Sequence, residues 1–115
     1  THFGNVPPPQ RPQAFPMRGP LLFGIAESER ARLFPDAVET GDWARAGMLM
    51  NTGHDGDRRV GREGQPYCFD ISDGAIARLA AERIPVERCP GGYGASTPAL
   101  DALVDAALGA GAYGA

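Results

Sequence analysis

The most regular pattern of apolar positions lies near the C-terminal end of the chain. Apolar side chains recur there at spacings of three and four residues, which is one face of an α-helix: Leu100, Leu103, Val104, Ala107 and Leu108. The hydroxyl of Thr97 can cap the first turn, and Pro98 suits the first helical position, where no N–H is needed. Gly109 and Gly111 can each adopt the left-handed backbone conformation that ends a helix. The pattern predicts a helix over residues 97–110.

This apolar helix has no evident partner element in the sequence that follows it. The sequence from Ala112 to Ala115 is typical of the start of a glycine-rich or extended segment. We therefore expect the chain to be a piece of a larger domain, with the apolar face around Leu103 partly uncovered.

A second helical pattern covers residues 25–40. Helix formers dominate from Ile25 to Phe34, and Pro35 then either ends the helix or begins another one as its first residue. The apolar run at residues 21–23 is either a short buried strand or the lead-in to this helix.

A third helix is predicted over residues 42–53, with Asp42 as its cap. One face of it carries Trp43, Ala46, Gly47 and Met50. Because large apolar and thioether side chains are usually buried, we expect the core to contain Trp43, Met48 and Met50.

A fourth helix is predicted over residues 72–83, with Ser72 or Asp73 as its cap. Its expected inward side chains are Ile76, Leu79 and Ala80. Residues 84–86 contain a proline and are too short for a central strand. The glycine cluster at residues 91–94 lacks the spacing of a phosphate-binding loop and is interpreted as a turn.

The first 20 residues differ from the rest in carrying six prolines. Proline excludes a regular helix or an inner strand, so we expect an irregular loop or linker at 1–20. A proline-rich ligand for an aromatic groove is the alternative, because Pro9 and Pro12 have the required spacing and Arg11 lies between them.

The charge and the cysteines limit the classes of function. All 11 basic residues are arginine, which excludes catalysis by a lysine within these residues. The net charge of −3 gives no sign of the broad basic surface that binds nucleic acid. No apolar run is long enough for a membrane span. We interpret Cys68 and Cys89 as free thiols of a cytoplasmic protein, with a single disulfide as the alternative.

One polar cluster, at residues 51–60, starts at the end of the third predicted helix and contains the neighbours His54 and Asp55. It can be a helix end with the histidine near the negative pole of the dipole, a loop that faces substrate or phosphate, or half of a metal site. The metal site, as in HD-type phosphohydrolases, needs a second histidine and a distal carboxylate. The only other histidine is His2, and Asp101 or Asp105 would be the carboxylate.

Three blocks resemble, in the same order, the C-terminal half of galactokinase-like sugar kinases of the GHMP kinase superfamily. The first runs from Glu29-Arg30 through a helix to Gly41-Asp42 and the Gly-Met-Leu-Met-Asn box at 47–51, and the second is Gly-His-Asp-Gly-Asp-Arg at 53–58. The third is the segment at 92–105 with its Ser-Thr-Pro-Ala-Leu-Asp helix start, and residues 111–115 match the opening of the family's glycine-rich third motif.

The resemblance implies ATP- and Mg²⁺-dependent transfer of a phosphoryl group to a monosaccharide hydroxyl, with the anomeric hydroxyl as the expected acceptor. It implies an α+β, ferredoxin-like parent lobe, of which residues 21–115 are an incomplete, mostly α-helical part, truncated at both ends. The phosphate-binding loop and catalytic aspartate of the family are not among these residues. The chain is therefore expected to hold no catalytic residue and no metal ligand, and to be inactive alone.

The same resemblance places four residues at the rim of the nucleotide and substrate cleft: His54, Asp55, Tyr113 and Gly114. Here Gly53 stands where the family usually has serine, and Ala99 replaces a common acidic residue. We expect His54 to orient the glycine-rich turn that would follow Ala115.

Two other classes of function remain open from the sequence. A freestanding helical interaction module would bind partners through the proline-rich start. An HD-type hydrolase would bind metal through His54 and Asp55.

Overall fold

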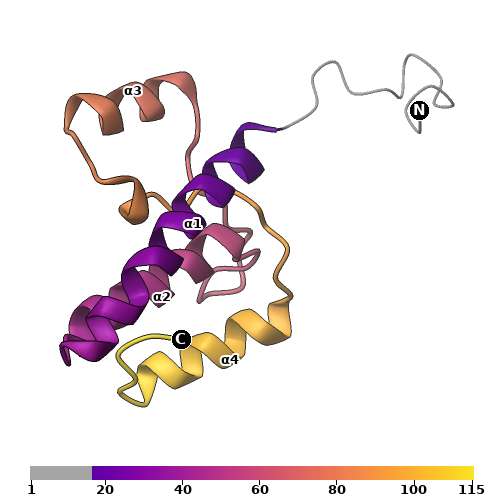
Figure 1. Cartoon of the computed structure of the whole chain (residues 1–115). Coiled ribbons are helices and arrows are strands. Elements are labelled where there is room, and N and C mark those ends of the chain that lie inside the picture. The colour runs from indigo at the N-terminus through magenta and orange to yellow at the C-terminus, as the bar shows by residue number, and fades with distance from the viewer. Residues whose placement is uncertain (1–16) are drawn as a thin grey trace, which may run out of the picture.

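The computed structural model describes residues 17–115, and these are mainly helical (Figure 1). The helices are α1 (Arg18–Glu39), α2 (Trp43–Asp57), α3 (Asp73–Ala81), the short 3-10 helix η3 (Val86–Arg88) and α4 (Pro98–Gly109). Within the described residues, β-type pairing is limited to an isolated antiparallel bridge between Val60 and Pro66. The mostly helical character predicted for the chain is confirmed.

Helix α1 begins earlier than the sequence predicted. It starts at Arg18, inside the stretch that was expected to be irregular up to Pro20, and it includes residues 21–23. Pro20 is tolerated because the first turn of a helix leaves its N–H groups unpaired. Pro35 lies inside the helix, so the prediction that it ends one helix or starts another is wrong. The predicted proline-rich ligand at residues 9–12 lies outside the described residues.

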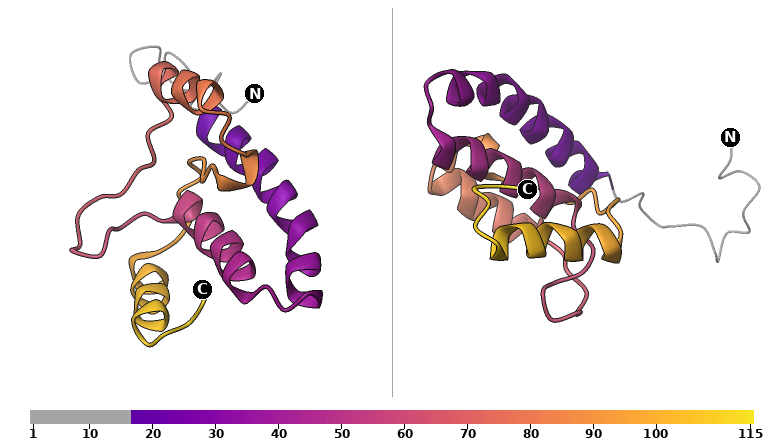
Figure 2. Two further views of the ribbon diagram at one scale, coloured as in Figure 1. Left: turned by 90° about the vertical axis from the view of Figure 1, so that its left-hand side faces the viewer. Right: turned by 90° about the horizontal axis from the view of Figure 1, so that it is seen from below.

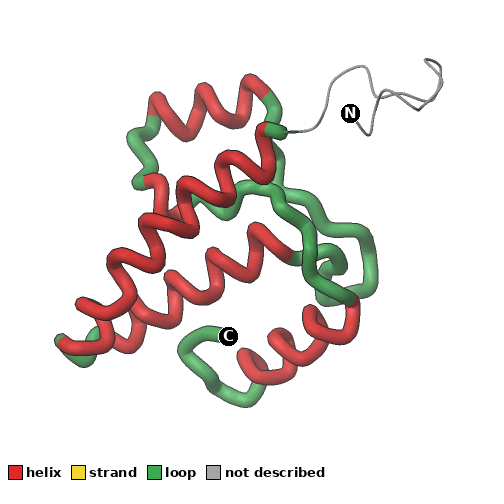
Figure 3. The backbone as a smooth tube through the Cα atoms, turned by 45° about the vertical axis from the view of Figure 1, so that its right-hand side comes forward, coloured by secondary structure: helices red, strands yellow, loops and turns green. Residues whose placement is uncertain are grey.

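Helices α1 and α2 form an antiparallel hairpin and lie side by side (Figures 1 and 3). The link between them is short because Gly41 adopts φ +71°, a left-handed conformation that ends α1. Asp42 then accepts a hydrogen bond from the N–H of Arg45 at 3.1 Å, which confirms it as the cap of α2.

The buried residues of α2 are mainly small, with Leu49 as the large one. Ala46, Gly47 and Leu49 are buried, whereas Trp43 is 51% exposed and Met50 is also exposed. The predicted core positions of Trp43 and Met50 are therefore wrong. At Gly47 the backbone of Tyr113 approaches so closely that a Cβ atom would collide with it, so no side chain fits at that position.

A buried arginine links α1 to the segment that carries η3. Arg30 is almost fully buried, and its guanidinium donates to the carbonyl oxygens of Glu87 at 3.2 Å and Cys89 at 2.9 Å. Glu27 balances the charge at 3.0 Å, and the guanidinium also lies over the ring of Phe23. Two backbone carbonyls and one carboxylate thus compensate the desolvation of this cation.

Helix α3 lies apart from the α1–α2 hairpin (Figure 1). Ser72 caps it by accepting from the N–H of Ala75 at 3.3 Å, and Asp73 is the first helical residue. Ile76 and Leu79 are partly buried, but Ala80, predicted to point inward, is exposed.

Helix α4 matches its predicted start and end closely. Thr97 accepts from the N–H of Leu100 at 3.1 Å, and Pro98 is the first helical residue. The stop is Gly111, with φ +103°, while Gly109 is still helical. Val104 is buried, whereas Leu103 is 66% exposed, so the apolar face is partly uncovered as expected.

The two cysteines are both free thiols, Cys68 exposed and Cys89 buried, as the sequence analysis expected. None of the helices between residues 17 and 115 has the length and apolarity needed to cross a bilayer.

Candidate functional site

The residues of the polar cluster lie in the last turns of α2 and not in a glycine-flanked loop. The helix continues through Asp57 and ends at its cap residue Arg58, so His54 and Asp55 are helical. Gly56, expected to loosen the backbone, is also helical and is buried. The cluster is consequently rigid, and each side chain points in a direction set by the helix.

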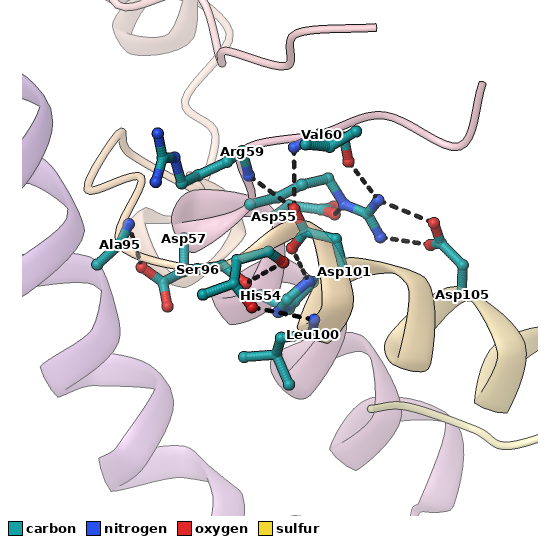
Figure 4. Close-up of polar contacts among 12 residues, drawn as sticks. His54, Asp55, Asp57, Arg59, Val60, Ala95, Ser96, Leu100, Asp101 and Asp105 are labelled. Carbon is teal, nitrogen blue, oxygen red and sulfur yellow. Dashed lines mark hydrogen bonds and ion pairs between the residues drawn. The ribbon is translucent and has the colours of Figure 1, made fainter. Parts of the chain in front are cut away.

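His54 faces the first turn of α4. Its Nε2 atom lies 2.9 Å from Oδ1 of Asp101, and the two side chains are only 9% and 2% exposed (Figure 4). The two atoms are not aligned as a hydrogen bond, so the contact is electrostatic. His54 thus packs against α4 with its side chain largely buried, and not on an exposed turn as expected, while its predicted place at the rim of a cleft stays a prediction.

Asp101 is the most connected carboxylate of the cluster. Its Oδ2 atom accepts from the backbone N–H groups of Arg59 at 3.0 Å and Val60 at 2.9 Å. Burial acts to raise the pKa of Asp101, but those two N–H groups and the Ser96 hydroxyl outweigh it, and the pKa is lowered. Asp101 therefore holds the exit of α2 against the start of α4 as an ionised group.

Arg58 and Asp105 form a second link between the same elements. The guanidinium of Arg58 is 7% exposed and binds the Asp105 carboxylate through both Nη atoms, Nη1 being 3.0 Å from Oδ2. The same Nη1 donates to the carbonyl oxygen of Val60 at 2.9 Å. The hydrogen bonds from Arg58 lower the pKa of Asp105, so this pair is also ionised at neutral pH.

Asp57 and Gly56 attach the loop that precedes α4. Oδ1 of Asp57 accepts from the N–H of Ala95 at 2.8 Å, and its carbonyl oxygen accepts from Ser96 at 3.0 Å. The carbonyl oxygen of Gly56 accepts from Tyr93 at 2.8 Å. Together with Asp101 and Asp105, these contacts make the end of α2 a latch for residues 93–105.

Asp55 lines a cavity beside the end of α2. The cavity has a volume of about 550 Å³, and its lining includes His54, Asp55, Arg58, Tyr67, Val104 and Leu108. Burial raises the pKa of Asp55, although the guanidinium of Arg58, 4.0 Å away, opposes this. Asp55 thus lies at a cavity wall, and its predicted place at the rim of a nucleotide and substrate cleft stays a prediction.

The glycine-rich segment returns from α4 to α2 (Figure 2). The backbone at Tyr113 and Gly114 lies against Gly47, while the Tyr113 side chain is exposed. Asn51 binds this backbone, and the sequence analysis gave it no role although it closes the Leu-Met-Asn box at 49–51. His54 and Ala115 both line a second cavity of about 330 Å³, so two of the predicted site regions are adjacent.

Between residues 17 and 115, no group of three or more His, Cys, Asp or Glu side chains is arranged to hold a metal ion. Comparison of the chain with protein families, curated proteins and solved structures found no match.

Replacing His54 by alanine should lower the free energy of unfolding by about 2 kcal/mol, because a buried carboxylate loses its neighbouring partner. Urea denaturation at pH 7 measures this change. The control is His54→Gln, which retains a polar group in the same space and should lose less. An alanine variant as stable as wild type would show that the buried contact contributes nothing.

Proposed function

We propose that this chain is part of an ATP-dependent sugar kinase of the galactokinase-like type in the GHMP kinase superfamily. The acceptor is a monosaccharide hydroxyl, with the anomeric hydroxyl favoured, and the protein is cytoplasmic. The helices would belong to an α+β, ferredoxin-like lobe of the complete enzyme.

The observation that carries this proposal is the meeting of the separate blocks on one helix. The block at 53–58 contacts the block at 92–105 through His54 and Asp57. The block at 47–51 contacts the glycine-rich segment at 111–115 through Asn51. Residues that resemble one family only in separate stretches thus form one continuous unit, which is expected if the resemblance reflects a shared structure.

The chain supplies scaffold rather than chemistry in this proposal. His54, Asp57 and Arg58 are occupied in holding α4 and its preceding loop, which favours a structural role for them over that of a general base. Phosphoryl transfer depends mainly on positioning and on charge around the γ-phosphate. ATP, Mg²⁺ and the catalytic groups would be held by residues outside this chain, and Asp55, Tyr113 and Gly114 would lie beside them.

Assaying the complete gene product that contains this chain tests the proposal. Purified protein with ATP and Mg²⁺ should release ADP in the presence of one or a few monosaccharides, and phosphorus NMR should show a sugar phosphate. The isolated chain serves as the control and should show no turnover. The absence of both ATP binding and ADP release across a broad sugar panel would contradict the proposal.

A further inference from the structure

Asn51 binds the backbone of the glycine-rich segment at two points. Its Nδ2 donates to the carbonyl oxygen of Tyr113 at 3.2 Å, and its Oδ1 accepts from the N–H of Ala115 at 3.2 Å. The carboxamide therefore pairs with the segment in the way that a neighbouring strand would, with one donor and one acceptor. The Asn51 side chain thus binds two backbone groups on the same side of the segment, the carbonyl of Tyr113 and the N–H of Ala115.

The backbone around this contact leaves no space for other side chains. A Cβ atom on Gly47, one turn before Asn51, would collide with the carbonyl oxygen of Tyr113. A Cβ atom on Gly114 would lie 2.6 Å from the carbonyl oxygen of Gly47, which is equally too close. Two glycines thus allow the segment to approach α2 closely enough for the Asn51 carboxamide to reach it.

The exposed Tyr113 side chain contributes little to holding the segment. Because it is 68% exposed, its burial cannot set the position of the backbone. Polar pairing to Asn51 and the close contact with Gly47 remain as the restraints on this side of the segment.

We propose that Asn51 is a positioning residue that sets where the glycine-rich segment at 111–115 lies relative to α2. This inference rests on the proposed kinase function, in which the segment lies beside the nucleotide. Glycine-rich backbone is suited to close approach by phosphate groups. A displaced segment should then weaken nucleotide binding before it affects the chemical step.

Asparagine is the side chain that this geometry requires. An aspartate at the same position keeps the acceptor for the N–H of Ala115, but when ionised it has no donor for the Tyr113 carbonyl. A protonated aspartate regains a donor, so its function should return only at a pH near or below the ordinary aspartate pKa of about 3.9. An alanine has neither group at any pH.

The test compares Asn51→Asp, Asn51→Ala and wild type in the complete enzyme. At pH 7.5, both variants should raise the KM for ATP about tenfold, which corresponds to the loss of one hydrogen bond, with kcat changed less. Between pH 7.5 and pH 5.5 the ratio of kcat/KM to that of wild type should stay constant for N51D as well as for N51A, because an aspartate carboxylate with a pKa of about 3.9 remains ionised there. Hydrogen exchange of the peptide that contains Tyr113 supplies a readout that does not depend on activity, and N51D should regain protection relative to N51A when the pH is lowered to about 4.

The outcomes separate this inference from the proposed function. A wild-type enzyme without ATP turnover would refute the kinase proposal, and the role of Asn51 toward the nucleotide with it. An active wild type with an unchanged KM for ATP in both variants would refute the positioning role alone. Equal exchange of this peptide in N51D and N51A at about pH 4 would also overturn it, because a purely structural defect has no reason to be relieved by protonation.

Discussion

Asp101→Ala is expected to lower the free energy of unfolding by about 4 kcal/mol, the largest effect of any single substitution considered for this chain. The change leaves the N–H groups of Arg59 and Val60 without their carboxylate acceptor. It also removes the carboxylate that lies 2.9 Å from His54. Urea denaturation measures the difference. The control is Asp36→Ala on the exposed surface of α1, which should change stability by less than about 0.5 kcal/mol.

The same carboxylate should make stability depend on pH at the acidic end. The folded state lowers the pKa of Asp101, so its stabilisation is complete above the unfolded-state pKa of about 3.9 and is lost as the pH falls through the lower folded value. Asp101→Asn should remove this part of the acid sensitivity, whereas Asp36→Asn should retain it. A wild type and an Asp101→Asn variant with parallel stability curves below pH 5 would contradict this assignment.

Gly56→Ala is expected to lower the free energy of unfolding by about 3 kcal/mol, although alanine is the better helix former by about 1 kcal/mol. The reason is steric. A Cβ atom at Gly56 would collide with the carbonyl oxygen of Pro90 and would lie 2.7 Å from the ring of Phe23. The loop would have to move, and the hydrogen bond from Tyr93 to the Gly56 carbonyl would be lost with it.

A matched glycine in α1 gives the control for this prediction. Gly24 is also helical, but a Cβ atom there would meet nothing within 4 Å. Gly24→Ala should therefore raise the unfolding free energy by up to about 1 kcal/mol. Thermal or urea denaturation of the two variants should show changes of opposite sign, and a stabilised Gly56→Ala would show that the close contact with the loop is not real.

The helix boundaries could be predicted because the information that sets them is local. Asp42 and Thr97 accept hydrogen bonds from N–H groups three residues ahead, and Gly41 and Gly111 supply left-handed conformations. Such caps depend on neighbours in sequence, so they can be read without knowing the fold. Pro35 is the exception, since tertiary packing of α1 keeps the helix continuous through a residue that normally ends one.

The site could be predicted only in part, for a physical reason. His54 was identified as notable, but its partner Asp101 lies on another helix, and a contact of this kind depends on how the helices pack. The sequence offers Asp101 as a distal carboxylate for a metal at His54, but it does not indicate that the two side chains contact each other directly. Asn51 was missed because its partners are backbone groups, which leave no signal in the sequence.

The latch between α2 and α4 also has a consequence for how the length of this chain can vary in evolution. The hydrogen bonds of Asp101 to the backbone of Arg59 and Val60 close a loop that contains α3. The entropy of closing a flexible loop grows only with the logarithm of its length, by about 0.6 kcal/mol for each doubling. Insertions or deletions around α3 should therefore cost little, and homologous chains are free to differ in length there while keeping both ends of the loop unchanged.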